Sequence, residues 1–186
     1  TPWRGLVLLI KAFKSLNLEN VELNVCSSTK IYGKKFDDIN AKDFENIFNN
    51  CKSTKNVNYL GFLNNNKIIE LLKNMHIYSF PSIWPETSCI SAIESMAAGC
   101  EVVATNLGAL YETCTPFSTL ICYDENLNNL EKKYSVALLN SIKNYWSYEN
   151  QKKLKLQRET INLLYSWETR SVEWKNFFDE IRKKKN

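Results

Sequence analysis

Short strand-like runs alternate with longer segments of helical periodicity along most of the chain, and this alternation restricts the fold more than any other feature. Apolar residues recur at helical spacing over 5–16, whereas apolar and polar residues alternate over 21–26 in the manner of a strand. The same reasoning predicts strands at 57–60, 76–80, 102–104 and 119–123, and helices around 44–51, 68–72, 90–98 and 110–113. Strands that alternate with helices need crossover connections, so we expect an α/β fold with a Rossmann-like parallel sheet of about five or six strands and helices on both faces.

The last third of the chain has a helical pattern. From Leu130 onward the helical spacing continues to the end, and Ser147 and Ser166 are the expected breaks between three helices. No stretch resembles an interdomain linker, so we predict a single domain over 1–186 whose last helices, from about residue 147, pack on it or cross from it. The tryptophans of this stretch are expected to be packing residues: Trp146, Trp167 and Trp174.

Charge and composition exclude several classes of protein. Lys and Arg number 24 against 20 Asp and Glu, and residues 182–185 supply the whole net charge of +4. The rest of the chain is formally neutral, which argues against nucleic-acid binding. The chain also lacks a run of about 18 apolar residues, the length that a membrane-spanning helix needs. The six cysteines form no CxxC pair, and a single histidine leaves no zinc-ligand spacing. We expect Cys26 and Cys122 to be small core residues and His76 to have a structural role.

One segment, 80–99, carries most of the candidate chemistry, because it follows a strand and opens a helix of small and apolar residues. Glu94 is the only charged residue between Thr87 and Cys100. A lone carboxylate in such a helix costs free energy unless it is paired or hydrogen-bonded, so we favour a functional role over that of a surface residue. Free N–H groups at the start of the helix favour an anion such as a phosphate, and N-capping by Thr87 or Ser88 is the simpler alternative.

A second carboxylate, Glu86, precedes this helix, with seven residues between it and Glu94. Eight helical residues rise by about 12 Å, which is too far for two carboxylates to flank one bond. We therefore expect Glu86 and Glu94 to contact different parts of one extended ligand.

Two other loops are candidates for the same site. Arg4 and Gly5 open a helix, which places a cation beside free N–H groups and suggests a second anion site. Gly108, in the loop that follows the strand at 102–104, allows a close approach of the backbone. Neither a Walker loop nor a GxGxxG motif is present, so the sequence does not favour ATP-binding or NAD-binding folds.

Together these motifs resemble the C-terminal, donor-binding domain of retaining glycosyltransferases with the GT-B fold, in glycosyltransferase family 4. The family signature is a Glu, seven residues and a second Glu, matched by Glu86 and Glu94. The resemblance covers nearly the whole chain in order. Its other motifs are Arg4-Gly5-Leu6, Tyr59-Leu60-Gly61-Phe62-Leu63, the strand and glycine loop at 102–112, and Ser166-Trp167-Glu168.

The resemblance implies a site for a nucleotide-sugar donor, linked to UDP or GDP. Glu94 would hold ribose hydroxyls, Glu86 would lie near the hydroxyls of the transferred sugar, and Arg4 would offset the charge of the diphosphate. Transfer would proceed with retention, without a metal and without a cofactor. The remaining donor-binding residues would be Gly5 at the Arg4 motif, Thr87, Ser88, Cys89 and Ile90 around the diphosphate, and Gly61, Phe62 and Leu63 along the base.

The family also implies partners and a location. Its N-terminal acceptor-binding domain is expected to be missing here, so this chain should bind donor without turnover. The whole enzyme would be a cytoplasmic hexosyltransferase of polysaccharide, lipopolysaccharide or glycolipid synthesis. Peripheral contact with the inner face of the membrane would come through the acceptor half. Two alternatives stay open: a related enzyme that modifies a nucleotide sugar, such as a 2-epimerase, and a non-catalytic α/β interaction module.

Overall fold

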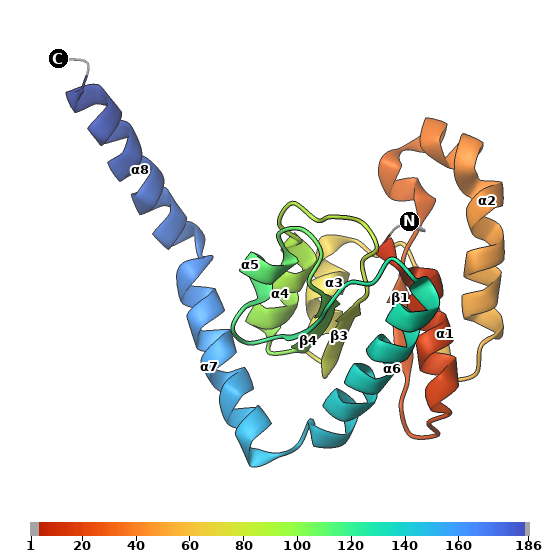
Figure 1. The fold of residues 1–186 in the computed structure, drawn as a ribbon. Coiled ribbons are helices and arrows are strands. Elements are labelled where there is room, and N and C mark those ends of the chain that lie inside the picture. The colour runs from red at the N-terminus through yellow and green to blue at the C-terminus, as the bar shows by residue number, and fades with distance from the viewer. Residues whose placement is uncertain (1–3, 185–186) are drawn as a thin grey trace.

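The computed structural model describes residues 4–184, and its elements follow the order predicted from the sequence (Figure 1). The strands are β1 (Leu23–Cys26), β2 (Val57–Gly61), β3 (Ile77–Phe80), β4 (Glu101–Thr105) and β5 (Thr119–Ile121). The helices are α1 (Leu6–Leu16), η2 (Thr29–Tyr32, a 3-10 turn), α2 (Lys34–Ser53), α3 (Asn65–Leu72), α4 (Ile90–Ala98), α5 (Leu110–Cys114), α6 (Leu127–Asn144), α7 (Tyr148–Leu164) and α8 (Trp167–Lys183).

All strand pairs are parallel, which confirms the predicted α/β class, but the strands form two sheets and not one. β1 pairs with β2, and the order of the second sheet is β3-β4-β5. Between β1 and the segment before β3, side chains meet instead of backbones, and the Asn24 amide contacts the Met75 sulfur at 3.4 Å. A cavity lined by both strands also separates them. The described chain therefore has five strands divided between two sheets, one of which has two strands and the other three.

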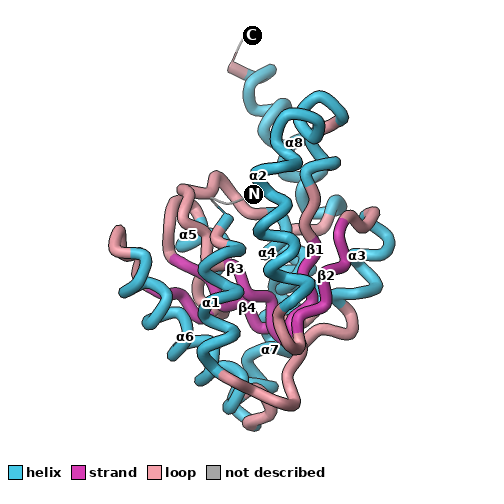
Figure 2. Tube along the Cα trace, turned by 90° about the vertical axis from the view of Figure 1, so that its right-hand side faces the viewer, coloured by secondary structure: helices cyan, strands magenta, loops and turns pink. Residues whose placement is uncertain are grey.

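β4 is the centre of the larger sheet, and all of its residues are buried. Val102 and Ala104 pack into a cluster with Met96 of α4 and Ile161 of α7 on one face. Val103, which points the other way, belongs to a cluster formed by α1 and α6. This alternation is the period of a strand, and a strand that is buried on both faces is typical of a parallel sheet covered by helices. Figure 2 shows helices on both sides of the strands.

The smaller sheet has its own core. Val25 of β1 and Val57 of β2 pack with Ile10 and Phe13 of α1 and with Cys51 of α2. Because α1 also contributes to the cluster under the larger sheet, this one helix joins the two sheets.

The C-terminal helices begin where the sequence predicts. The hydroxyls of Ser147 and Ser166 cap α7 and α8 by accepting hydrogen bonds from Asn150 and Thr169 backbone N–H groups. α7 packs against α4, whereas α8 projects away from the sheets (Figure 1).

The packing role predicted for three tryptophans is wrong within the described chain. Trp167 is 86% exposed, Trp174 58% and Trp146 73%. For the first two the reason is that α8 extends beyond the sheets, so its apolar side chains have little to pack on. Trp146 does contact His76, with ring centroids 5.4 Å apart, and His76 is also exposed.

The cysteine prediction is only partly right. Cys26 and Cys122 are exposed, contrary to expectation, because each stands at or just past the carboxyl end of its strand, outside the core. The other four are buried: Cys51, Cys89, Cys100 and Cys114. None of the described helices combines the length and apolarity needed to span a bilayer.

Candidate active site

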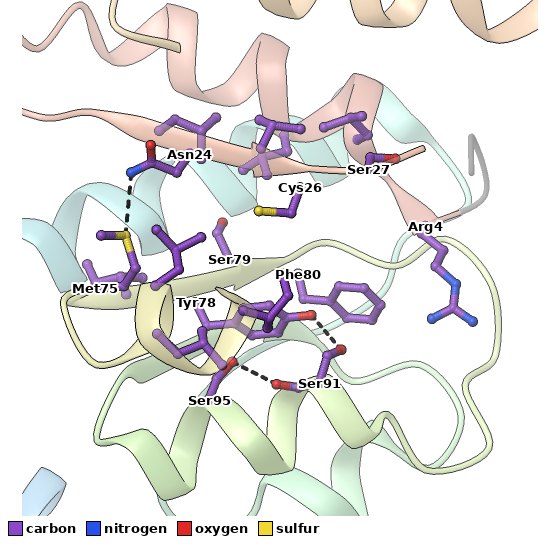
Figure 3. Close-up of a pocket in the computed structure, with 18 of the residues that line it drawn as sticks. Arg4, Asn24, Cys26, Ser27, Met75, Tyr78, Ser79, Phe80, Ser91 and Ser95 are labelled. Atoms are coloured by element: carbon purple, nitrogen blue, oxygen red, sulfur yellow. Dashed lines mark hydrogen bonds between the residues drawn. The ribbon is translucent and has the colours of Figure 1, made fainter. Parts of the chain in front are cut away.

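A cavity of about 550 Å³ lies between β1 and β3 and reaches the carboxyl ends of both strands. In parallel α/β sheets ligands bind at this edge, where loops lead into helices. In Figure 3, Cys26 and Ser27 lie on one wall and Tyr78 and Ser91 on the other, with Arg4 near the mouth. Glu94 belongs to the same lining, so two residues from distant predicted motifs, Arg4 and Glu94, share one cavity.

The start of α4 has no side-chain cap. Its N-cap residue is Cys89, and no side chain accepts a hydrogen bond from the first turn. Capping by Thr87 or Ser88, the simpler alternative in the sequence, is therefore wrong; both residues are exposed. In the first turn, the N–H of Ala92 donates to the Cys89 carbonyl at 3.0 Å. The N–H groups of Ile90 and Ser91 precede it and have no carbonyl partner within the helix, so they and the positive end of the helix dipole are available to an anion.

α1 begins in the same way, at Gly5, without a side-chain cap. Gly5 lies so close to Pro81, at the end of β3, that a Cβ on Gly5 would stand 1.8 Å from the Pro81 carbonyl oxygen. This contact brings the start of α1 against the loop that leads into α4. In contrast, Asn64, Asn126, Ser147 and Ser166 cap α3, α6, α7 and α8 with their side chains.

Glu86 is buried, with 7% of its surface exposed. Its Oε2 is 3.3 Å from Nη1 of Arg4, so the carboxylate has an ionic partner from the start of α1. Its backbone pairs with the third predicted loop, because the N–H of Ala109 donates to the Glu86 carbonyl at 2.7 Å and Glu86 bridges Gly108. The family resemblance placed Arg4 at the diphosphate and Glu86 at the transferred sugar. The pairing of these two residues with each other was not predicted from the sequence.

Glu94 lies on α4 and is exposed, in contrast to Glu86. Among the described residues it takes part in no ion pair, and its side chain borders the cavity. An apolar helix that keeps one free carboxylate beside a cavity is consistent with a ligand contact. Neighbouring polar groups on the same wall are tied to one another, since the hydroxyls of Tyr78 and Ser91 are 2.7 Å apart.

Cys89 occupies a left-handed backbone conformation, with φ of 63°, although it is not glycine. Its side chain is buried in the core cluster, and burial raises the pKa of its thiol, so the group stays neutral beside the expected anion. The family resemblance assigned only the backbone N–H of Cys89 to the diphosphate. A side chain that is buried in the core is compatible with that role.

We expect Cys89→Gly to be more stable than Cys89→Ala by about 1 kcal/mol, because both lose the thiol but only glycine adopts this conformation without strain. Urea unfolding of the two variants measures the difference. Ala97, inside the same helix, supplies the control: Ala97→Gly should lose about 1 kcal/mol, the opposite sign. Equal stability of the two Cys89 variants would contradict the strain.

The residues expected along the nucleotide base stand apart from this cavity. Gly61 ends β2, one strand farther out, and Phe62 and Leu63 follow it; none of the three contributes to the lining of the cavity. The lining comes instead from residues after β1 that the sequence did not single out: Ser27, Ser28 and Tyr32. Tyr111 of α5 is 60% exposed and is not a core residue.

Within residues 4–184 no group of three or more His, Cys, Asp or Glu side chains is arranged to hold a metal ion. The acidic residues of the site contribute to different contacts. Glu86 faces Arg4, and Glu94 borders the cavity from α4.

Solved structures share this fold. A glycosyltransferase from Rickettsia africae ESF-5 is 21% identical, with a TM-score of 0.72 over 98% of this chain and 46% of its own. Anabaena HepE in complex with UDP is 16% identical, with a TM-score of 0.77 over 97% of this chain and 46% of its own. The corresponding values for sucrose-phosphate synthase from Thermosynechococcus elongatus are 16%, 0.73, 98% and 43%.

The chain thus spans less than half the length of these structures. Among curated protein sequences no relative matches it. The family described as glycosyl transferases group 1, however, matches residues 1–155, which is most of the chain. With the parallel α/β fold and the site between β1 and β3 already in place, this match shows that the chain belongs to the family of glycosyl transferases group 1.

Proposed function

We propose that this chain is the donor-binding half of a retaining, metal-independent hexosyltransferase and that it binds a nucleoside diphosphate sugar. The observation that carries the proposal is that one cavity is lined by three features: Arg4, Ser91 in the first turn of the uncapped helix α4, and the free carboxylate of Glu94. Residues 87–90, which precede Ser91, do not line this cavity themselves. A diphosphate needs N–H donors and a cation, and ribose hydroxyls need an acceptor.

The proposed roles follow from these positions. The diphosphate lies at the start of α4, around Ser88, Cys89 and Ile90, with Arg4 beside it. Glu94 accepts hydrogen bonds from the ribose, and Glu86 faces the hydroxyls of the transferred sugar. When the bond to the sugar breaks, negative charge grows on the leaving diphosphate, and a preorganised helix N-terminus and a cation lower the free energy of that state. In this mechanism the two groups take the place of a metal ion.

In the proposal, the acceptor half lies outside this chain, and this chain alone binds the donor without transferring the sugar. This part of the proposal is supported by the length of the chain, which spans less than half of the solved structures with this fold. The cytoplasmic location, the contact with the membrane face and the assembly of a polysaccharide or glycolipid remain parts of the same proposal. UDP is the first nucleotide to test, because Anabaena HepE was solved with UDP and with UDP-glucose.

The test is an isothermal titration of the protein with UDP, GDP and ADP, repeated on Glu94→Ala. We expect one nucleotide to bind in the micromolar to millimolar range and its Kd to rise about tenfold or more in the variant, because a hydrogen bond to a charged acceptor is lost. Glu159→Ala, which removes an exposed carboxylate from α7, is the matched control and should bind as the wild type does.

The possible results of this titration distinguish a donor-binding domain from a non-catalytic interaction module. Selective binding that is lost with Glu94 supports the donor site and identifies the base. Binding that is unchanged in Glu94→Ala would remove Glu94 from the site. If no nucleotide binds to this chain or to a longer chain with the acceptor half, the non-catalytic interaction module becomes the better account.

A further inference from the structure

The carboxylate of Glu86 has a second partner besides Arg4. The hydroxyl of Ser82 is 3.3 Å from Oε1 of Glu86, whereas Arg4 contacts Oε2 at 3.3 Å. The two contacts differ in kind, since Arg4 is partly exposed, with 44% of its side-chain surface accessible, and Ser82 is fully buried. One oxygen of Glu86 thus faces a cation at the mouth of the cavity, and the other faces a neutral hydroxyl inside the protein.

Ser82 is itself held firmly to the larger sheet. Its backbone N–H donates to the Phe80 carbonyl at 2.9 Å, and its carbonyl accepts a hydrogen bond of 2.7 Å from the hydroxyl of Thr105. Thr105 is fully buried at the end of β4, the central strand. These two hydrogen bonds therefore fix Ser82, and with it the loop that carries Glu86, to the neighbouring strands β3 and β4.

The Ser82 hydroxyl has one proton and two acceptors within reach. It is 2.8 Å from the Trp84 carbonyl and 3.3 Å from Glu86. While Arg4 pairs with Glu86, the nearer carbonyl is the better acceptor. A diphosphate at the start of α4 would draw Arg4 toward itself, and the buried carboxylate would then need another donor. The hydroxyl of Ser82 is the group placed to supply it.

We propose that Ser82 is a positioning residue that orients the Glu86 carboxylate toward the transferred sugar when the donor diphosphate engages Arg4. This inference rests on the proposed function, because it requires Glu86 to face the sugar. Ser82 touches neither sugar nor phosphate in this arrangement. It acts through Glu86, so removing its hydroxyl should weaken the binding of ligands that carry the sugar and not that of the free nucleotide.

The experiment compares UDP-glucose with UDP on wild type and Ser82→Ala by isothermal titration, with GDP-mannose and GDP in their place if GDP is the nucleotide that binds. We expect the Kd for the nucleotide sugar to rise about fivefold more than the Kd for the free nucleotide, because one hydrogen bond to the carboxylate is lost. A merely structural role would weaken both ligands equally. In a Glu86→Ala background the further change to Ser82→Ala should leave the ratio of the two Kd values unchanged.

Ser141 supplies a matched control, because its buried hydroxyl donates at 2.9 Å to another buried carboxylate, Glu101, away from the site. Ser141→Ala should leave the Kd ratio as in the wild type. If Ser82→Ala does not fold, Ser82→Cys keeps the side-chain volume and replaces the hydroxyl with a weak donor. The same selective loss is expected of it.

The failures can be told apart. A wild type that binds both ligands while Ser82→Ala leaves their ratio unchanged overturns the role of Ser82 alone. A wild type that binds neither ligand, as this chain or with the acceptor half, overturns the proposed function and the role of Ser82 with it.

Discussion

Replacing Gly5 with alanine should destabilise the protein by about 3 kcal/mol and disrupt the proposed donor site, because the new methyl group meets both a strained backbone and a fixed carbonyl. Gly5 has a φ of +77°, where side chains are rarely tolerated. The added Cβ would stand 1.8 Å from the Pro81 carbonyl oxygen and 2.7 Å from its carbon, so α1 or the loop into α4 must move. Arg4 precedes Gly5 directly, and its contact with Glu86 should be lost with that movement.

Gly99→Ala is the matched control for this substitution. Gly99 has the same left-handed backbone conformation as Gly5, but the Cβ that it would gain lies 3.7 Å from the flexible side chain of Arg158, an ordinary contact. It should therefore lose only the conformational part, about 1 kcal/mol. Urea unfolding measures both variants, and nucleotide titration follows the site. Equal losses for the two variants would show that the contact between Gly5 and Pro81 is not tight in solution.

A second large effect is expected away from the proposed donor site, at Glu101, the first residue of β4 and only 3% exposed. One carboxylate oxygen accepts hydrogen bonds from Ser141 of α6 at 2.9 Å and from Thr119 of β5 at 3.3 Å. The other accepts from the Asn150 amide of α7 at 3.0 Å, and Nζ of Lys153 in the same helix lies 3.8 Å from the first oxygen. A single buried carboxylate thus ties two helices and a neighbouring strand to the start of the central strand.

We expect Glu101→Ala to lower the free energy of unfolding by about 3 kcal/mol, because it leaves the buried Ser141 hydroxyl and the partly buried donors of Thr119 and Asn150 without this acceptor. Glu101→Gln keeps part of the network and should lose less. Glu94→Ala, the same change at an exposed position, should leave stability nearly unchanged while it weakens nucleotide binding. Denaturant unfolding of the three variants tests this order, and a Glu101→Ala protein as stable as the wild type would refute the role of the network.

Much of the fold could be predicted from the sequence because its signals are local. The period of apolar residues located the strands and the helices, and Ser147 and Ser166 marked the breaks before α7 and α8, where their hydroxyls cap the helices. Alternation of strands with helices was enough for the parallel α/β class. The candidate loops were found in the same way, since ligand-binding sites of this fold class lie in the loops where a strand leads into a helix.

Contacts between distant segments lay beyond these signals. The pairing of Arg4 with Glu86 depends on the start of α1 lying against the loop after β3, and nothing in either segment alone indicates it. The network around Glu101 likewise joins residues of four elements. Exposure was misjudged for Trp167 and Cys26, because burial depends on what an element packs against and not on its own composition.

The sequence by itself therefore determined the order of the elements, the parallel class and the loops proposed to form the site, because each depends on the spacing of neighbouring residues. Only the tertiary structure decided that the strands divide into two sheets with a cavity between β1 and β3, and which residues face that cavity. It also decided that Glu86 is buried between Arg4 and Ser82. The physical reason is that hydrogen bonds, ion pairs and burial are set by distances in space, and these exist only once the helices have packed on the strands.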